Sequence, residues 1–148
     1  MEILKLSDNK FFQGRIATSE EIGLLKKYFN SISFLAVYID LVKNCRIIEQ
    51  QFYIAADQDR SGMGVQMQWL TPNEQIQESF QSYPGIIVTK KDFLPIGACL
   101  AGSGDPYFLK IENNKWNIYR VLHDFAVDGK YRPEMHEFVI DLEHLMMI

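Results

Sequence analysis

A polar segment in the first half of the chain has the spacing of a calcium-binding loop. Side-chain oxygens recur at every second position, as they do around the ion, in Asp57, Asp59 and Ser61. Gly62 follows where such a loop turns sharply, but Gln68 stands where it needs a bidentate glutamate. Because two carboxylates without this glutamate bind a hard cation weakly, we expect a solvated polar loop and no metal site.

A glycine-rich segment in the second half resembles two reactive motifs without completing either. A phosphate-binding loop needs a lysine directly after its second glycine, and Ser103 stands at that position. Ser103 is also no nucleophile elbow, because Ala101 and Asp105 stand where Gly-x-Ser-x-Gly needs its glycines. Glycine adopts positive φ at little steric cost, so we expect turns between strands and no cofactor. The residues assigned to these turns are Gly97, Gly102 and Gly104.

His123 and Asp124 form a histidine–acid pair that could activate a nucleophile. A triad can be drawn by adding Cys99, but nothing in the spacing requires it, and neighbouring side chains on a strand point to opposite faces. His136 and His144 are eight residues apart, so they cannot form the i,i+4 pair of a zinc-binding helix, and we expect both to be exposed. We therefore predict no catalytic or metal-ligating residue and keep an enzyme built on Cys99 or His123 as a minor alternative.

The N-terminal half is expected to begin with two helices. Thr18 and Glu21 have the spacing of a capping box, and Ser33 is expected to cap a second helix that ends near Asn44. Residues 45–54 and 65–70 are predicted as strands because they are rich in β-branched, aromatic and Gln residues without a helical stripe.

A third helix should start after Thr71, with Pro72 near its first position. Its apolar face is expected to contain Ile76, Phe80 and Tyr83.

The rest of the chain is predicted to hold three further elements. Residues 86–89 form a short β-type run, and 107–122 form a hairpin around a four-residue turn at 112–115. Pro133 opens a C-terminal helix whose apolar stripe runs from Met135 to Met146.

Because consecutive strands mostly lack helices between them, the expected fold is α+β. We predict one domain over residues 1–148, in which a mainly antiparallel, twisted sheet is flanked by two N-terminal helices and one C-terminal helix.

Charge and composition narrow the function classes. With 47% hydrophobic residues the chain can form a packed core, in which we place Trp69, Trp116 and both cysteines. The net charge of −4 arises in residues 121–148, which carry two basic and six acidic side chains. Basic doublets at 26–27 and 90–91 have acidic neighbours, so nucleic-acid binding is disfavoured.

The longest uncharged run, residues 61–73, is 13 residues long and too short to span a membrane. Charges at Glu2 and Lys5 oppose a secretory signal, so we expect a cytoplasmic protein.

The stretches 93–97 (FLPIG), 102–109 (GSGDPYFL) and 121–125 (VLHDF) resemble the central signature of the SUKH superfamily. In that signature a "flPIG" motif is followed by a "Gd" pair, an apolar strand, a turn and a strand ending in an "hD"-like pair. The two N-terminal helices and a C-terminal helix near Glu134–Phe138 also fit, so the resemblance covers about residues 18–146. The chain lacks the family's usual Asn-Gly-Gly after the second helix and an acidic residue near Lys110, which concerns the subfamily more than the fold.

The resemblance, to a family of Smi-one/Knr-four cell-wall regulators, Syd proteins and bacterial immunity proteins, implies a non-enzymatic protein-binding module. Our first hypothesis is an intracellular immunity-type protein that binds a toxin, for example a nuclease, in a concave face of the sheet, since an acidic surface suits a basic cleft. The alternative is a scaffold that regulates cell-wall glucan or envelope synthesis. The oligomeric state is left open.

The signature positions suggest partner-binding residues, which are Asp105, Tyr107, His123 and Asp124. Asp105 as a turn anchor and Tyr107 as a core residue are the competing structural interpretations.

Overall fold

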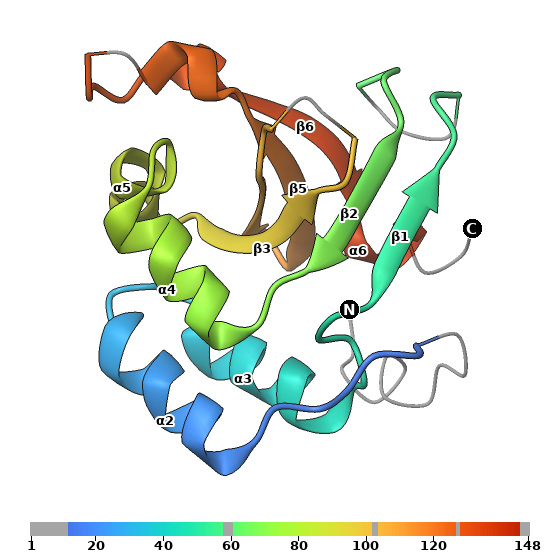
Figure 1. Ribbon diagram of the computed structural model, residues 1–148, viewed down its shortest axis with the longest axis vertical. Coiled ribbons are helices and arrows are strands. Elements are labelled where there is room, and N and C mark those ends of the chain that lie inside the picture. Colours follow the sequence, from blue (N-terminus) through green and yellow to red (C-terminus); the bar gives the residue numbers. More distant parts are fainter. Residues whose placement is uncertain (1–11, 58–60, 102–103, 127, 146–148) are drawn as a thin grey trace.

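The computed structural model describes residues 12–57, 61–101, 104–126 and 128–145. Within these ranges the chain has an α+β fold built on one curled, six-stranded sheet (Figure 1). Every strand pairs antiparallel with its neighbours, in the order in which the strands occur along the chain. The strands are β1 (Gln51–Ile54), β2 (Val65–Trp69), β3 (Leu94–Cys99), β4 (Tyr107–Glu112), β5 (Lys115–Val121) and β6 (His136–Asp141). This confirms the predicted fold class and the antiparallel sheet.

Five α-helices lie in the described ranges. They are α2 (Ser19–Tyr28), α3 (Leu35–Asn44), α4 (Pro72–Gln81), α5 (Gly85–Val88) and α6 (Leu142–Leu145). Three short 3-10 helices join them: η1 (Thr89–Lys91), η2 (His123–Ala126) and η3 (Pro133–Met135). Figure 1 shows α2 and α3 running in opposite directions below the strands, with α4 and α5 beside them. No helix in the described ranges has the length and apolar character needed to cross a bilayer.

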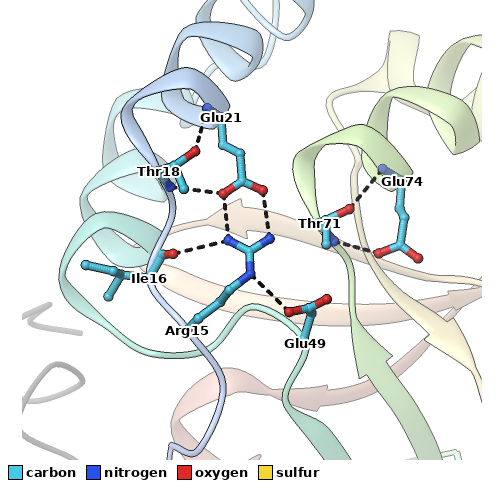
Figure 2. A network of polar contacts seen from close by, with 7 residues as sticks. All are labelled: Arg15, Ile16, Thr18, Glu21, Glu49, Thr71 and Glu74. Atoms are coloured by element: carbon cyan, nitrogen blue, oxygen red, sulfur yellow. Dashed lines mark hydrogen bonds and ion pairs between the residues drawn. The ribbon is translucent and has the colours of Figure 1, made fainter.

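Both long helices predicted from capping signals begin as expected. The hydroxyl of Thr18 accepts the backbone N–H of Glu21 at 3.2 Å, and the Glu21 carboxylate accepts the Thr18 N–H at 3.0 Å. Thr71 and Glu74 repeat this arrangement at the start of α4, at 3.2 and 2.9 Å (Figure 2). Each box satisfies two backbone donors that a helix N-terminus leaves unpaired, so these starts are encoded locally.

Arg15 ties the first capping box to the segment that precedes β1. Its guanidinium donates to both oxygens of Glu21, at 2.7 and 2.9 Å, and to Glu49 at 3.0 Å (Figure 2). This fork-to-fork contact is the geometry in which arginine binds a carboxylate most strongly. The hydrogen bond from Arg15 holds the pKa of Glu21 below its ordinary value, although partial burial opposes that effect.

The second helix forms as predicted, but Ser33 does not cap it. The N-cap residue of α3 is Phe34, which makes no side-chain capping bond. The Ser33 N–H donates to the Asp92 carboxylate at 2.7 Å, and the Ser33 hydroxyl donates to the other oxygen of the same group. Ser33 therefore does not act as a helix cap. It links the connection between α2 and α3 to Asp92, just before β3.

The main core lies between the helices and one face of the sheet, with Trp69 near its centre. Trp69 is fully buried, and its indole N–H donates to the hydroxyl of Tyr38 at 3.1 Å. Gln75 donates to that hydroxyl at 3.0 Å and to the carbonyl of Pro95 at 2.7 Å. Trp69 is thus a core residue, as predicted, and so are Trp116 and Cys45, whereas Cys99 is only half-buried.

A second apolar cluster covers the opposite face of the sheet at β4 and β5. It is formed by α5 and the 3-10 helices packed against the strands, with buried Ile87, Val88, Phe93, Phe108, Val121, Ala126 and Met135. Burial on both faces explains the near-continuous apolar character of residues 107–109.

Two helix-related predictions for the middle of the chain are wrong. Residues 86–89 are not a strand, because they form α5 and the start of η1. In α4 the buried positions include Gln75 and Ser79, while Phe80 and Tyr83 are 48% and 56% exposed. The side-chain nitrogen of Gln75 donates to Tyr38, and Ser79 accepts from the Thr89 hydroxyl at 2.9 Å, whereas the Gln75 Oε1 is buried without a hydrogen-bond partner among the described residues. The apolar stripe therefore identifies only part of the packed face, at Ile76, which packs against the core.

The strand predictions need smaller corrections. The 45–54 run is shorter than expected, because only Gln51–Ile54 forms a strand. The predicted four-residue turn at 112–115 closes the β4–β5 hairpin: Glu112 pairs with Lys115, and the two central residues are Asn113 and Asn114. Their φ values of 51° and 63° are in the left-handed region that asparagine tolerates better than most residues.

The predicted C-terminal helix is wrong. Pro133–Met135 is a 3-10 turn, His136–Asp141 is the edge strand β6, and the single helical turn α6 follows within the described residues. The register of β5 and β6 shifts between Ile118 and Tyr119, which leaves Val139 as an extra residue on β6. Because this bulge buries the consecutive residues Val139 and Ile140, it breaks the strand alternation and produces a helix-like pattern.

Candidate functional site

Three of the four proposed partner-binding residues lie together. Asp105 precedes β4, while His123 and Asp124 begin η2 directly after β5. The Asp105 carboxylate accepts the backbone N–H of His123 at 2.9 Å and also bonds the ring Nδ1 of His123. The ring Nε2 lies 3.3 Å from the Asp124 carboxylate. A strand would have separated His123 from Asp124, but the 3-10 turn brings both side chains to one surface.

The two carboxylates make this cluster electronegative. The hydrogen bond that the Asp105 carboxylate accepts from the imidazole raises the pKa of His123, and the charges of Asp105 and Asp124 act in the same direction. The Asp124 side chain is 90% exposed, whereas that of Asp105 is 14% exposed. Asp105 therefore orients the imidazole and fixes the local backbone, and Asp124 presents its charge to solvent.

The glycines assigned to turns have different environments. Gly104 precedes the cluster with a φ of 75°, the conformation that the turn prediction requires. Gly97 does not lie in a turn: it is inside β3, where an added Cβ would be 2.6 Å from the Met67 sulfur and 3.0 Å from Tyr107. Its role is to permit close packing across the sheet. Gly102 lies outside the described residues.

Tyr107 is not part of this surface. It is 2% exposed, its ring lies 5.3 Å from the Arg120 guanidinium, and its hydroxyl accepts from Arg120 at 3.3 Å. The core interpretation therefore replaces the partner-binding one for this residue.

Arg120 is a buried cation that sequence reasoning missed. It is 3% exposed and donates to the Gly64 carbonyl at 2.6 Å, to Glu137 at 3.0 Å and to the Ser61 hydroxyl at 3.0 Å. These bonds fasten the end of the β1–β2 connection to β5 and β6. The alternation of buried Trp116, Ile118 and Arg120 along β5 was the available signal.

A hollow of about 470 Å³ lies beside His123. Its other lining residues are Tyr83, Ala126, Asp128 and Gly129. Tyr83 is more than half exposed here, so its ring is available for contact. Asp128 accepts from Arg132, and this interaction lowers the pKa of Asp128.

A smaller hollow of about 160 Å³ lies between α4 and the ends of β2 and β3. Carboxylates of Glu74 and Glu78 line it, together with Leu70, Gln77, Ser82, Gly97, Ala98 and Pro106. Burial raises the pKa of Glu78 to about 7, and the hydrogen bond that its carboxylate accepts from the Gly85 N–H at 3.2 Å opposes that rise.

The two hollows are neighbours, since Ser82 and Pro106 of one are adjacent in sequence to Tyr83 of the other and to Asp105. We call this surface the acidic groove. It is defined by Glu74, Glu78, Tyr83, Asp105, His123, Asp124 and Asp128. The C-terminal excess of acid predicted Asp124 and Asp128, but no sequence signal placed Glu74, Glu78 and Tyr83 beside them.

Of the two histidines that were predicted to be exposed, one is exposed and the other is not. His144 is exposed, as expected. His136 is not: it lies on β6 among Phe93, Tyr119 and Tyr131, and burial lowers its pKa. Its strand position explains this error, because the predicted helix would have placed it in solvent.

Among the residues that the structure describes, no group of three His, Cys, Asp or Glu side chains is arranged to hold a metal ion. Part of the calcium-like segment, including Asp59, lies outside those residues. Its Ser61 accepts a hydrogen bond from Arg120.

No family model, no curated protein and no solved structure matches the chain. The resemblance to the SUKH superfamily therefore stays a prediction from the sequence.

Proposed function

We propose that the chain is a non-enzymatic protein-binding module of the immunity type, which neutralises a basic toxin such as a nuclease through the acidic groove. The observation that carries this proposal is the convergence of five carboxylates around two adjoining hollows. They come from distant parts of the chain, α4, the start of β4 and η2 with its following turn. The exposed negative charge of the groove is centred on Asp124 and Glu74, because Arg132 pairs with Asp128 and the pKa of Glu78 is about 7.

Two physical features suit this surface to a basic protein. Nuclease clefts are positively charged because they hold phosphates, and opposite charge speeds encounter and fixes orientation. Tyr83 supplies a large exposed ring to the hollow beside His123, and tyrosine is among the residues that contribute most at protein interfaces. The groove therefore combines long-range attraction with a short-range anchor.

The test is affinity purification of the tagged full chain from its native cells. We compare the parent with Tyr83→Ser/Asp124→Asn, because both side chains are exposed and the fold should persist. The matched control, Tyr53→Ser/Glu20→Gln, removes an exposed tyrosine and an exposed acid elsewhere.

The proposal expects one basic protein to be enriched by the parent and the control and lost with the groove variant. Its purified toxic activity should be inhibited by the parent. Recovery of a set of envelope-synthesis enzymes would favour the scaffold alternative and refute the immunity role. Equal recovery of the basic protein by the groove variant would refute the assigned surface.

A further inference from the structure

A second groove runs between α2 and α3, away from the acidic groove. It has a volume of about 360 Å³ and an apolar floor formed by Ile22, Leu35 and Ile39. The remaining lining residues are Lys26, Ala36, Asp40 and Lys43. The two helices run in opposite directions (Figure 1), and residues of both line the groove.

The apolar floor of the groove lies at the edge of the core. The residues of α3 that pack inward are Tyr38, Ile39, Leu41 and Val42. Ile22 and Leu35 are half-buried: they pack against the core and also line the groove, so each presents apolar surface on its outer side.

The two lysines stand at opposite ends of the channel. Lys26 is near the end of α2 that leads into α3, and Lys43 is near the free end of α3. Within the described ranges neither lysine makes an ion pair, and Asp40 is the one acidic residue in the lining. This basic rim contrasts with the net charge of −4 of the whole chain.

We propose that this groove binds an amphipathic helix with acidic flanks, supplied by a partner protein. The apolar face of such a helix would cover the floor, and its carboxylates would pair with Lys26 and Lys43. Each wall is ten residues long, or about 15 Å, which accommodates about three helical turns. Helix-in-groove recognition uses this combination of an apolar channel and a charged rim. The proposal is independent of the acidic groove.

The test uses two synthetic peptides with the same leucine stripe, one with glutamate and one with lysine at all polar positions. Binding to the full chain is measured by NMR of isotope-labelled Ile and Leu methyl groups. The glutamate peptide should shift the methyl signals of Ile22, Leu35 and Ile39 and bind about tenfold more tightly than the lysine peptide. Equal affinity of the two peptides, or shifts located elsewhere, would overturn the proposal.

A charge-reversal pair separates specific docking from general attraction. Lys26→Glu/Lys43→Glu should lower the affinity for the glutamate peptide about tenfold. Lys90→Glu/Lys115→Glu changes the net charge equally at exposed positions elsewhere and should leave that affinity unchanged. Circular dichroism confirms that each variant is folded. Equal loss in both variants would overturn the proposal. So would binding to phosphatidylserine vesicles that depends on Lys26 and Lys43 while the glutamate peptide fails to bind.

Discussion

The Glu78 carboxyl provides a quantitative test of the acidic groove. Burial raises its pKa from an ordinary value of 4.5 to about 7. At a pH between these values the folded chain keeps a proton that the unfolded chain releases. The free energy of unfolding therefore falls as pH rises through this window, and the penalty is complete above about pH 7.

The magnitude follows from the size of the shift. One pKa unit corresponds to about 1.4 kcal/mol, so the Glu78 charge should cost about 3 kcal/mol of stability at alkaline pH. Glu78→Gln keeps an oxygen that can accept the Gly85 N–H but cannot ionise. The free energy of unfolding of the variant, measured relative to the parent, should therefore increase by about 3 kcal/mol between about pH 4 and about pH 8.

The assay is urea unfolding of the parent and the variant across this pH range, followed by tryptophan fluorescence. Taking the difference between the two proteins removes the contribution of all other titrating groups. Glu134→Gln, at an exposed position, is the control, and its difference in free energy of unfolding from the parent should not grow comparably with pH. A Glu78→Gln difference that stays constant from acid to alkaline pH would refute the argument that this carboxyl is desolvated.

Four further substitutions are tested, each by urea unfolding. Arg120→Met should cost about 3 kcal/mol because it removes charge-assisted bonds from a buried site, and a cost below about 1 kcal/mol would contradict the fastening role. Gly97→Ala should destabilise the fold by about 1–3 kcal/mol through overpacking. Its control, Gly23→Ala, has open space around the added Cβ and should stabilise α2 by about 0.5–1 kcal/mol. If Gly97→Ala were stabilising and Gly23→Ala destabilising, the close approach in β3 would be refuted. Asn114→Gly should raise stability by about 0.5–1 kcal/mol because its φ is positive, and a loss would contradict the turn geometry.

The elements predicted correctly are those encoded by neighbouring residues. The starts of α2 and α4 depend on capping boxes that span four residues, Thr18–Glu21 and Thr71–Glu74, and both formed as expected. The β4–β5 hairpin is similarly local. The C-terminal segment was misassigned because its conformation depends on pairing with β5, and a bulge at Val139 changes the spacing of its buried residues.

The candidate site was predictable in part for the same reason. Asp105, His123 and Asp124 were selected from signature positions, and the meeting of β4 and β5 brings them together. Glu78 and Tyr83 join them only because α4 and its following turn lie across the end of the sheet. That placement follows from the burial of Gln75 against Tyr38, which no spacing in the sequence indicates.

The most direct test of the central claim is amide hydrogen exchange of the chain, alone and bound to the basic protein recovered from native cells. Binding through the acidic groove predicts slower exchange at residues 82–86, 104–106 and 123–126, with α2 and α3 unchanged. Unchanged exchange at all three of these segments, with protection confined to other surfaces, would contradict the assignment.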